Sequence, residues 1–322
     1  MSYVVFDMDE TLAQLSSVYY FIATLTATNQ ETTKSAATNK NAFLMEPLEP
    51  HLPVAYDYFV QRVLKEEQSD RPLGILRPGI LDIMETLYQL KKKRLIHGIL
   101  IYSNNSHLDS LYFIRDLIHV HYPRLILDCI HWLHPLRNID RVQYHRSAGK
   151  ISKTWENVKS VMVDGTTKAP SFLEPSEVHF FDDQFHVNLK NALGKNYHQV
   201  PPYQFKASFD RIVPLFLSSL SYAEVDLYEL ENKLAPLYPD LQNQHVINQL
   251  NKGNTTLLED IIDLFRYYVN SDSKNNAMPP LDSALPIAEV IATMEHNAVL
   301  HQGGNKKKRI HTLKRKRRTI RR

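Results

Sequence analysis

The sequence predicts an α/β protein with a doubly wound, three-layer α/β/α fold around a parallel sheet. Two observations predict this fold class. Short apolar runs of strand length, rich in β-branched and aromatic residues, recur up to about residue 181. Amphipathic helical patterns lie between them, and strands that alternate with helices pair in parallel through crossover connections. In such a fold ligands bind beyond the carboxyl ends of the strands, so we expect the functional site there.

Four segments are predicted strands, because each has the length and residue content of a buried strand. They are YVVF at Tyr3–Phe6, ILIY at Ile99–Tyr102, LILDCI at Leu125–Ile130 and VHFF at Val178–Phe181. The only cysteine of the chain, Cys129, lies in the third run. It excludes an internal disulfide, fits a reducing compartment, and is expected to be a small buried hydrophobic residue.

Helices are predicted between these strands. Apolar residues recur at helical spacing in 80–90, 108–120 and 154–163. An insertion at residues 14–72 follows the first strand and contains a loop-like stretch rich in Thr and Asn, then a helical pattern at 53–68. The insertion is long enough for a small lid but too short for an independent domain.

The chain divides into three predicted parts: an α/β domain at residues 1–210, a helical region at 211–302 and a basic tail at 303–322. The strand signals stop near residue 210, where amphipathic helices take over. One of these helices begins at the capping box Thr256–Glu259, and another covers 284–300.

The basic tail contrasts with the rest of the chain. Its last 17 residues, 306–322, carry 11 Lys or Arg and no acid. The remaining 305 residues therefore hold 38 − 11 = 27 basic side chains against 35 acidic ones, which gives them a formal charge of −8. Such a run repels itself and is expected to stay disordered until it meets a polyanion. Nucleic acid, a nuclear import receptor and an acidic surface are the candidate partners, and a solubilising extension without a partner is the alternative.

The sequence pattern argues against a membrane-spanning protein and against a secreted one. No run approaches the roughly 18 consecutive apolar residues of a membrane span. The N-terminus carries acids at positions 7, 9 and 10, where a signal peptide has a basic and then an apolar stretch. We therefore expect an intracellular protein, cytoplasmic or nuclear, that does not associate with membranes.

Polar residues follow three of the predicted strands. The pairs are Asp7 and Asp9 after the first strand, Ser103 and Asn104 after the second, and Asp182 and Asp183 after the fourth. An Asp-x-Asp pair alone is typical of a solvated turn, but a parallel sheet gathers all of these side chains at one edge. Acids gathered there repel one another and need a compensating cation. Mg²⁺ binds through one or two carboxylates plus water and phosphate oxygens, so the acids at 7, 9, 182 and 183 predict a Mg²⁺ site.

A hydroxyl at Ser103 and a lysine near residue 150 would complete a phosphate site. The candidate lysines are Lys150, Lys153 and Lys159. Lys153 is favoured because it stands just before a helical pattern, from which its ammonium can point back to the strand ends. The alternative for each is an exposed lysine on a helix surface. Gln184 and His186 could also face the pocket, although we expect His186 to be a structural histidine with its hydrogen bonds satisfied.

In this order, FDMDETL, IYSNN, SKTWENV and FFDDQ resemble the four motifs of the haloacid dehalogenase (HAD) superfamily phosphatases, whose first motif is Asp-x-Asp-x-Thr. The DETL form is most similar to the NLI-interacting-factor-like branch, which includes phosphatases of the RNA polymerase II C-terminal domain. With the downstream VPPY, the set also resembles HAD-like proteins of large DNA viruses, which implies a virus-encoded protein that acts in the host cell or is packaged in the virion. The resemblance covers residues 1–205. The chain differs from the NLI-interacting-factor-like branch in two ways. Its fourth motif is Asp-Asp where the branch usually has Asp-Asn, and its insertion is longer than the short flap of the branch.

The resemblance implies a HAD-like fold and a Mg²⁺-dependent phosphomonoester phosphatase. Asp7 would be the nucleophile that forms an aspartyl-phosphate, and Asp9 the acid and then the base. The metal would be held by Asp7, the backbone carbonyl of Asp9, and the Asp182 and Asp183 pair. Phosphoryl oxygens would be bound by Ser103, with Asn104 beside it, and by Lys153, while Thr11 supports the loop at the substrate.

Three alternatives stay open for the function. A phosphoprotein or another macromolecule is the expected substrate, because a short lid leaves the cleft open. A lid that closes over the site would instead suit a small metabolite, and a nucleic-acid 3′-phosphate is a further candidate. Outside enzymology, the chain could be a catalytically weak or inactive HAD-fold module that binds nucleic acid through its basic tail.

Overall fold

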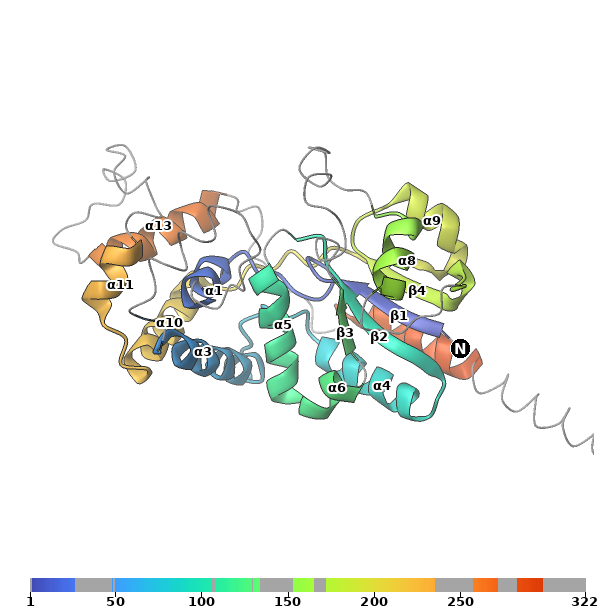
Figure 1. Ribbon diagram of the computed structural model, residues 1–322, viewed down its shortest axis with the longest axis horizontal. Helices are drawn as coiled ribbons and strands as arrows, with labels where there is room; N and C mark the ends of the chain where they lie inside the picture. The colour runs from blue at the N-terminus through green and yellow to red at the C-terminus, as the bar shows by residue number, and fades with distance from the viewer. Residues whose placement is uncertain are drawn as a thin grey trace, which may run out of the picture.

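In the computed structural model, the described residues form a sheet of five parallel strands, which lies in the right half of Figure 1. The structure describes residues 2–26, 48, 50–105, 108–128, 130–133, 153–164, 172–234, 257–271 and 283–297. Within these residues the strand order is β3-β2-β1-β4-β5. The strands are β1 (Ser2–Asp7), β2 (Ile96–Tyr102), β3 (Ile130–Leu133), β4 (Val178–Asp182) and β5 (Tyr197–Gln199). The predicted α/β class with a parallel sheet is confirmed.

The central strand, β1, pairs with both β2 and β4, and the three end at the same level. Asp7 is the pairing partner of Tyr102, and Phe6 is the partner of Phe181. Nearly every residue of β1 is buried, as expected for a strand covered on both faces. The pairing therefore brings Asp7, Asp182 and the residue after Tyr102 to one carboxyl edge.

Helices cover both faces of the sheet, as the three-layer prediction requires. On one face α8 (Trp155–Asp164) and α9 (Val187–Leu193) bury residues against Val5, Leu100 and Phe180. On the other face lie α4 (Ile80–Lys92), α6 (Pro123–Asp128) and a helix at residues 285–297. The arrangement is compatible with a HAD-like domain, and that finer assignment stays a prediction.

The third predicted strand is wrong in its position. Most of Leu125–Ile130 belongs to α6, and β3 begins only at Ile130. Pro123 opens this helix, because proline at a first helical position has its backbone angle preset and lacks only an amide that would be unpaired anyway. A short apolar run does not distinguish a strand from a buried helical turn. The three-residue edge strand β5 was not predicted, and Cys129 lies outside the described residues.

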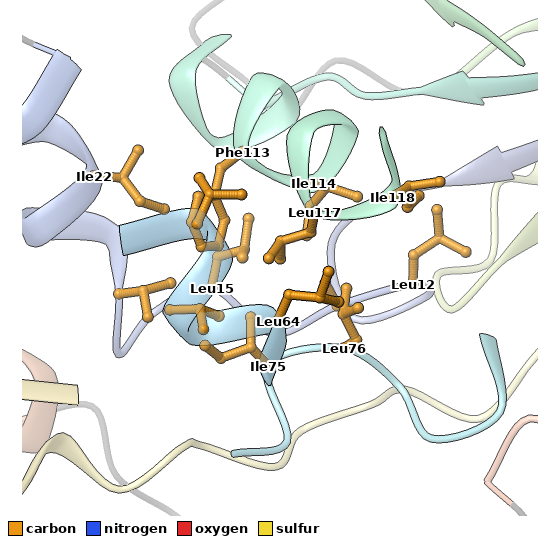
Figure 2. Packing of buried hydrophobic residues seen from close by; sticks show 14 of the residues in the cluster. Leu12, Leu15, Ile22, Leu64, Ile75, Leu76, Phe113, Ile114, Leu117 and Ile118 are labelled. Carbon is orange, nitrogen blue, oxygen red and sulfur yellow. The ribbon is translucent and has the colours of Figure 1, made fainter. Parts of the chain in front are cut away.

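The helices of the insertion pack against helices from the C-terminal part of the chain. They are α1 (Tyr19–Thr26) and α3 (Leu52–Glu67), and they join α5 (Leu108–His121), α10 (Phe209–Tyr222), α11 (Leu227–Leu234) and α13 (Leu257–Ser271). We call these six helices the helical assembly. Figure 2 shows Ile22 of α1, Leu64 of α3 and Phe113 of α5 in one apolar cluster. The insertion, which ends at residue 72, thus shares its core with α5 and with helices that begin only at Phe209.

The remaining predictions on organisation are met in part or lie outside the described residues. The helical pattern at 284–300 corresponds to helix 285–297, and α13 begins directly after Thr256, which is not described. The basic tail at 303–322 is also outside the described residues, and the domain boundaries stay a prediction. Among the described helices, none combines the length and the hydropathy that crossing a membrane requires.

Candidate active site

A tight loop after β1 positions the first two acids. The amides of Leu12 and Ala13 donate to the carbonyl of Met8 at 2.9 and 3.2 Å, so the chain folds back on itself directly after Asp7. At the tip of this loop Glu10 adopts a left-handed backbone conformation, with φ of 52°. A residue with a side chain rarely adopts this conformation, so the surrounding contacts must hold it.

Three buried carboxylates meet at the carboxyl edge. Asp7 ends β1, Asp182 ends β4, and Asp183 follows it; their exposed fractions are 5%, 0% and 7%. One carboxylate oxygen from each lies within 4.8 Å of the others. We call this group the acid triad, and it contains three of the four residues predicted to bind the metal.

Lys153 supplies the positive charge next to the acid triad. Its Nζ lies 2.5 Å from Oδ1 of Asp7 and 2.9 Å from Oδ2 of Asp182. Burial disfavours the ammonium, but the two carboxylates outweigh it, so the pKa of Lys153 is raised and the group stays charged. Of the other candidate lysines, Lys159 lies partly exposed on α8, and Lys150 is outside the described residues.

The charge of the acid triad is not balanced by Lys153. Three carboxylates and one ammonium leave two formal negative charges in a buried site. Burial and the Asp7 carboxylate raise the pKa of Asp183 to about 6. The pKa of Asp182 is raised to about 7, by burial against the opposing effect of Lys153. A divalent cation would supply the missing charge, and an all-oxygen donor set suits a hard cation, so the triad could hold a metal ion.

Asp9 lies in a separate environment from Asp7. Its carboxylate accepts two hydrogen bonds from the Asn105 side chain, both at 3.2 Å. Burial, followed by repulsion from Asp7, raises the pKa of Asp9 to about 7. This carboxyl group can therefore hold a proton near neutral pH. Its side chain is not part of the acid triad, and the expected contact of its backbone carbonyl with a metal stays a prediction.

The end of β2 supplies the polar residues of the second predicted motif. Ser103 is fully buried, and its Oγ accepts a hydrogen bond from the amide of Asn105 at 3.0 Å. Asn104 lies between them and is partly buried. Asn105 was not predicted as a site residue, although the pattern of two asparagines after the strand was visible. Through Asn105, this loop is tied to the loop that carries Asp9.

Thr11 holds Asp183 in place. Its hydroxyl donates to Oδ1 of Asp183 at 3.2 Å and accepts from the amide of Asp183 at 3.0 Å. Thr11 is fully buried, and both contacts connect the loop after β1 to the end of β4. This placement favours a supporting role over direct contact with a substrate.

His186 differs from the expected structural histidine. Its Nε2 is buried 3.5 Å from Oδ2 of Asp182 and makes no hydrogen bond within the described part of the chain. Burial and the Lys153 ammonium lower the pKa of His186 to about 4, so the ring is neutral. The Gln184 side chain is exposed, and its backbone N–H donates to Oδ1 of Asp182 at 2.9 Å.

Sequence reasoning missed Arg77, the largest fully buried polar side chain near the site. It is 2% exposed and lies directly before the Pro-Gly that precedes α4. Its guanidinium donates to the backbone carbonyl of Glu10 in the loop after β1. Burial lowers the pKa of Arg77 to about 10, and the group remains charged at neutral pH. An arginine followed by Pro-Gly is common in turns, so the sequence offered no signal for this contact.

The chain matches no family model, and the searches of curated proteins and of solved structures also find no match. The resemblance of its motifs to HAD phosphatases therefore stays a prediction. The site has to be interpreted from its own geometry.

Proposed function

We propose that this protein is a Mg²⁺-dependent phosphomonoester phosphatase that works through an aspartyl-phosphate intermediate. One observation carries the proposal. The buried carboxylate of Asp7 contacts the Lys153 ammonium at the carboxyl edge and lies close to two further carboxylates with which it could hold a metal ion, while the Asp9 carboxyl is held by Asn105. A nucleophile, a cationic group and an acid with a different environment are the parts that phosphoryl transfer through an enzyme carboxylate needs.

In the first step, an oxygen of Asp7 attacks phosphorus, and the P–O bond to the leaving group breaks. Asp9 gives its proton to the departing oxygen. The raised pKa of Asp9, about 7, supports this role, because an acid must still carry its proton at neutral pH when the leaving group departs. The products of this step are an alcohol and a phosphorylated Asp7.

In the second step, water attacks phosphorus, and the bond between phosphorus and Asp7 breaks. The Asp9 carboxylate, which lost its proton in the first step, accepts the proton of that water. Inorganic phosphate leaves, and both carboxyl groups return to their starting states. One carboxyl group thus serves as acid and then as base. The intermediate on Asp7 splits one difficult hydrolysis into two easier steps.

The remaining residues stabilise charge and orient groups. Lys153 would bind the phosphoryl oxygens and offset the charge that develops in transfer, while the Ser103 hydroxyl and the neighbouring Asn104 would hydrogen-bond them. Asp7, Asp182 and Asp183 would hold Mg²⁺ together with the Asp9 carbonyl. When bound, Mg²⁺ would offset the negative charge of the phosphate and of the nucleophile. Thr11 keeps Asp183 in position for this role.

A phosphoprotein or another macromolecule is the substrate class that we favour. The described part of the insertion buries its apolar surface in the helical assembly, where Phe21 of α1 contacts Phe209 and Phe216 of α10. Helices held in that core are not free to swing over the site, which favours an open cleft. A panel of phosphopeptides, 3′-phosphorylated oligonucleotides and sugar phosphates tests this, and a clear preference for sugar phosphates would contradict it.

The activity is tested with a generic aryl phosphate in the presence of Mg²⁺. The parent protein should hydrolyse it, and Asp7→Asn should reduce kcat by about 10³-fold or more, because the nucleophile is lost. Asp210→Asn is the matched control, since it makes the same chemical change on a side chain that is 81% exposed. Equal rates for the parent and Asp7→Asn would refute the proposed function.

The basic tail favours a second function that is compatible with the first. Its 11 basic side chains without an acid would bind nucleic acid or an import receptor. For nucleic acid, affinity should fall steeply with salt and be lost when residues 306–322 are removed. Turnover on no phosphate substrate, combined with salt-sensitive binding, would identify the chain as a binding module.

A further inference from the structure

The Arg77 guanidinium joins three segments that are distant in the sequence. Nη2 donates to the carbonyls of Glu10 and Pro201, both at 2.7 Å, and Nη1 donates to the carbonyl of Ser283 at 3.0 Å. These carbonyls belong to the loop after β1, the segment after β5 and the turn that precedes helix 285–297. Its hydrogen-bond acceptors among the described residues are thus backbone carbonyls rather than carboxylates. The flat fork of an arginine presents five donors on three nitrogens in a fixed geometry, whereas a lysine presents three donors on a single nitrogen.

The carbonyl of Glu10 is the contact that matters for the site. It accepts from Arg77 and, at 2.6 Å, from the amide of Tyr203. Glu10 is the residue with the left-handed backbone, and it directly follows Asp9. Two hydrogen bonds to one carbonyl fix the orientation of that peptide group. They therefore fix the turn that sets where Asp9 lies.

A second set of contacts holds Arg77 itself in register with this loop. The amide of Arg77 donates to the carbonyl of Leu12 at 2.8 Å, and Ala13 forms a β-bridge with Leu76. The guanidinium carbon lies 5.4 Å from the centre of the Tyr203 ring. Backbone and side chain of Arg77 thus both contact the segment from Glu10 to Ala13. A side chain that only filled space would not need these hydrogen bonds to the loop after β1.

We propose that Arg77 is a positioning residue of the candidate active site, which holds Asp9 in place through the carbonyl of Glu10. Arg77 does not contact the reacting atoms. Its effect is on the proton transfer that Asp9 carries out, and the inference rests on the proposed phosphatase function. Because the same guanidinium binds the carbonyl of Ser283, the position of helix 285–297 is linked to the same loop.

The test uses the dependence of rate on the leaving group. An alkyl phosphate needs the acid, because its departing oxygen is strongly basic, whereas an aryl phosphate with an acidic phenol needs it little. The ratio of kcat/KM for the aryl substrate to that for the alkyl substrate is measured in the full chain. Asp9→Asn defines the ratio when the acid is absent. The ratio does not depend on how much of a preparation is folded, because both substrates are assayed on the same sample.

Arg77→Lys is the main variant, and Arg77→Met removes all donors. A positioned general acid contributes about 10²–10⁴-fold to the rate, so we expect the ratio to rise about tenfold in Arg77→Lys and further in Arg77→Met, towards that of Asp9→Asn. Tyr203→Phe is the matched control: it loses the hydrogen bond from its hydroxyl to Gly74 but keeps the amide contact to Glu10. Its ratio should equal that of the parent.

Each outcome decides the inference. A raised ratio in both Arg77 variants, with the parent ratio in Tyr203→Phe, supports it. A parent ratio in Arg77→Lys and Arg77→Met, or failure of Arg77→Lys to fold where Tyr203→Phe folds, assigns Arg77 to stability alone and overturns it. A parent protein that hydrolyses neither substrate refutes the proposed phosphatase function instead, and the inference falls with it.

Discussion

At the carboxyl edge, Asp7, Asp182 and Asp183 are buried around one ammonium group, whereas the helical assembly buries mainly rings and aliphatic chains. Phe21 illustrates the second kind of interior, with the rings of Phe209, Phe216 and Phe265 at 5.1, 4.8 and 5.7 Å from its own. Burying apolar area stabilises a fold, while burying like charges destabilises it unless they are compensated. The difference indicates that the helical assembly contributes stability, whereas the buried acids at the edge cost stability and are explained by the proposed phosphatase function.

The two regions should therefore respond to different changes. A change of side-chain volume should affect the helical assembly, and a change of charge or of metal should affect the edge. The predictions below separate these responses.

Phe21→Ala should give the largest loss of stability. The side chain is fully buried, and truncating a buried phenylalanine costs about 3–5 kcal/mol, because apolar contacts are lost and a cavity remains. Chemical denaturation measures the change in the free energy of unfolding. Phosphatase activity per folded molecule should stay close to that of the parent. A loss of less than about 1 kcal/mol would contradict the assignment of Phe21 to the core.

Lys153→Met should give the next largest loss, measured without divalent cations. The change leaves the buried carboxylates of Asp7 and Asp182 without their ammonium partner, and breaking a buried ion pair costs about 3 kcal/mol or more. Lys159→Met is the matched control on a partly exposed lysine of α8. Unlike Phe21→Ala, Lys153→Met should also abolish turnover when the protein is folded. Equal stability of the two lysine variants would contradict the role of Lys153.

These two regions also differ in how far they could be predicted from the sequence. Asp7 and Asp182 are predicted to meet because they follow apolar strands, and parallel pairing brings strand ends together. Lys153 is predicted to join them because it stands just before a helical pattern. The sharing of one core by α1, α3 and α10 could not be predicted. Amphipathic periodicity shows that a helix has an apolar face but not which distant helix covers it.

The same limit explains the other differences. The sequence predicts a strand where α6 lies because a short apolar run fits both structures, and β5 is too short to carry a pattern. Arg77 was missed because its partners are backbone carbonyls, which leave no trace in residue type. His186 was assigned satisfied hydrogen bonds, although only the packing around Asp182 determines whether a partner is present.

Mg²⁺ should raise the stability of the parent by a smaller amount. A ligand that binds only the native state adds about 2.7 kcal/mol at a concentration of one hundred times its Kd. Thermal unfolding at increasing Mg²⁺ concentration measures this effect. Asp183→Asn, which removes one carboxylate of the acid triad, should need more Mg²⁺ for the same shift, and Asp210→Asn should behave as the parent. The same Mg²⁺ dependence in all three proteins would indicate that the triad does not bind the ion.

Glu67 should give the smallest effect, one that depends on pH. Its carboxylate accepts from the amides of Ile75 and Gly74 at 2.6 and 3.2 Å, and so supports the segment that leads to Arg77. Burial raises the pKa of Glu67 from 4.5 to about 7, although these amides and Arg211 act in the opposite direction. The folded state therefore binds a proton more tightly than the unfolded state does. Stability from this group is fully present below about pH 4.5 and is lost as the pH rises through 7.

Glu67→Gln removes this dependence, because the amide stays neutral at every pH. Between pH 5 and pH 8 the variant should gain about 2.5 kcal/mol relative to the parent. Any constant cost of replacing the carboxylate cancels in that difference, so the measurement is the free energy of unfolding of both proteins at the two pH values. If the difference in free energy of unfolding between the variant and the parent is the same at pH 5 and pH 8, Glu67 is ionised in the folded protein throughout this range. A fall in phosphatase activity with unchanged stability would instead indicate that the loop after β1 moves when Glu67 is altered. The segment from Ile75 to Arg77 contacts both that loop and Glu67.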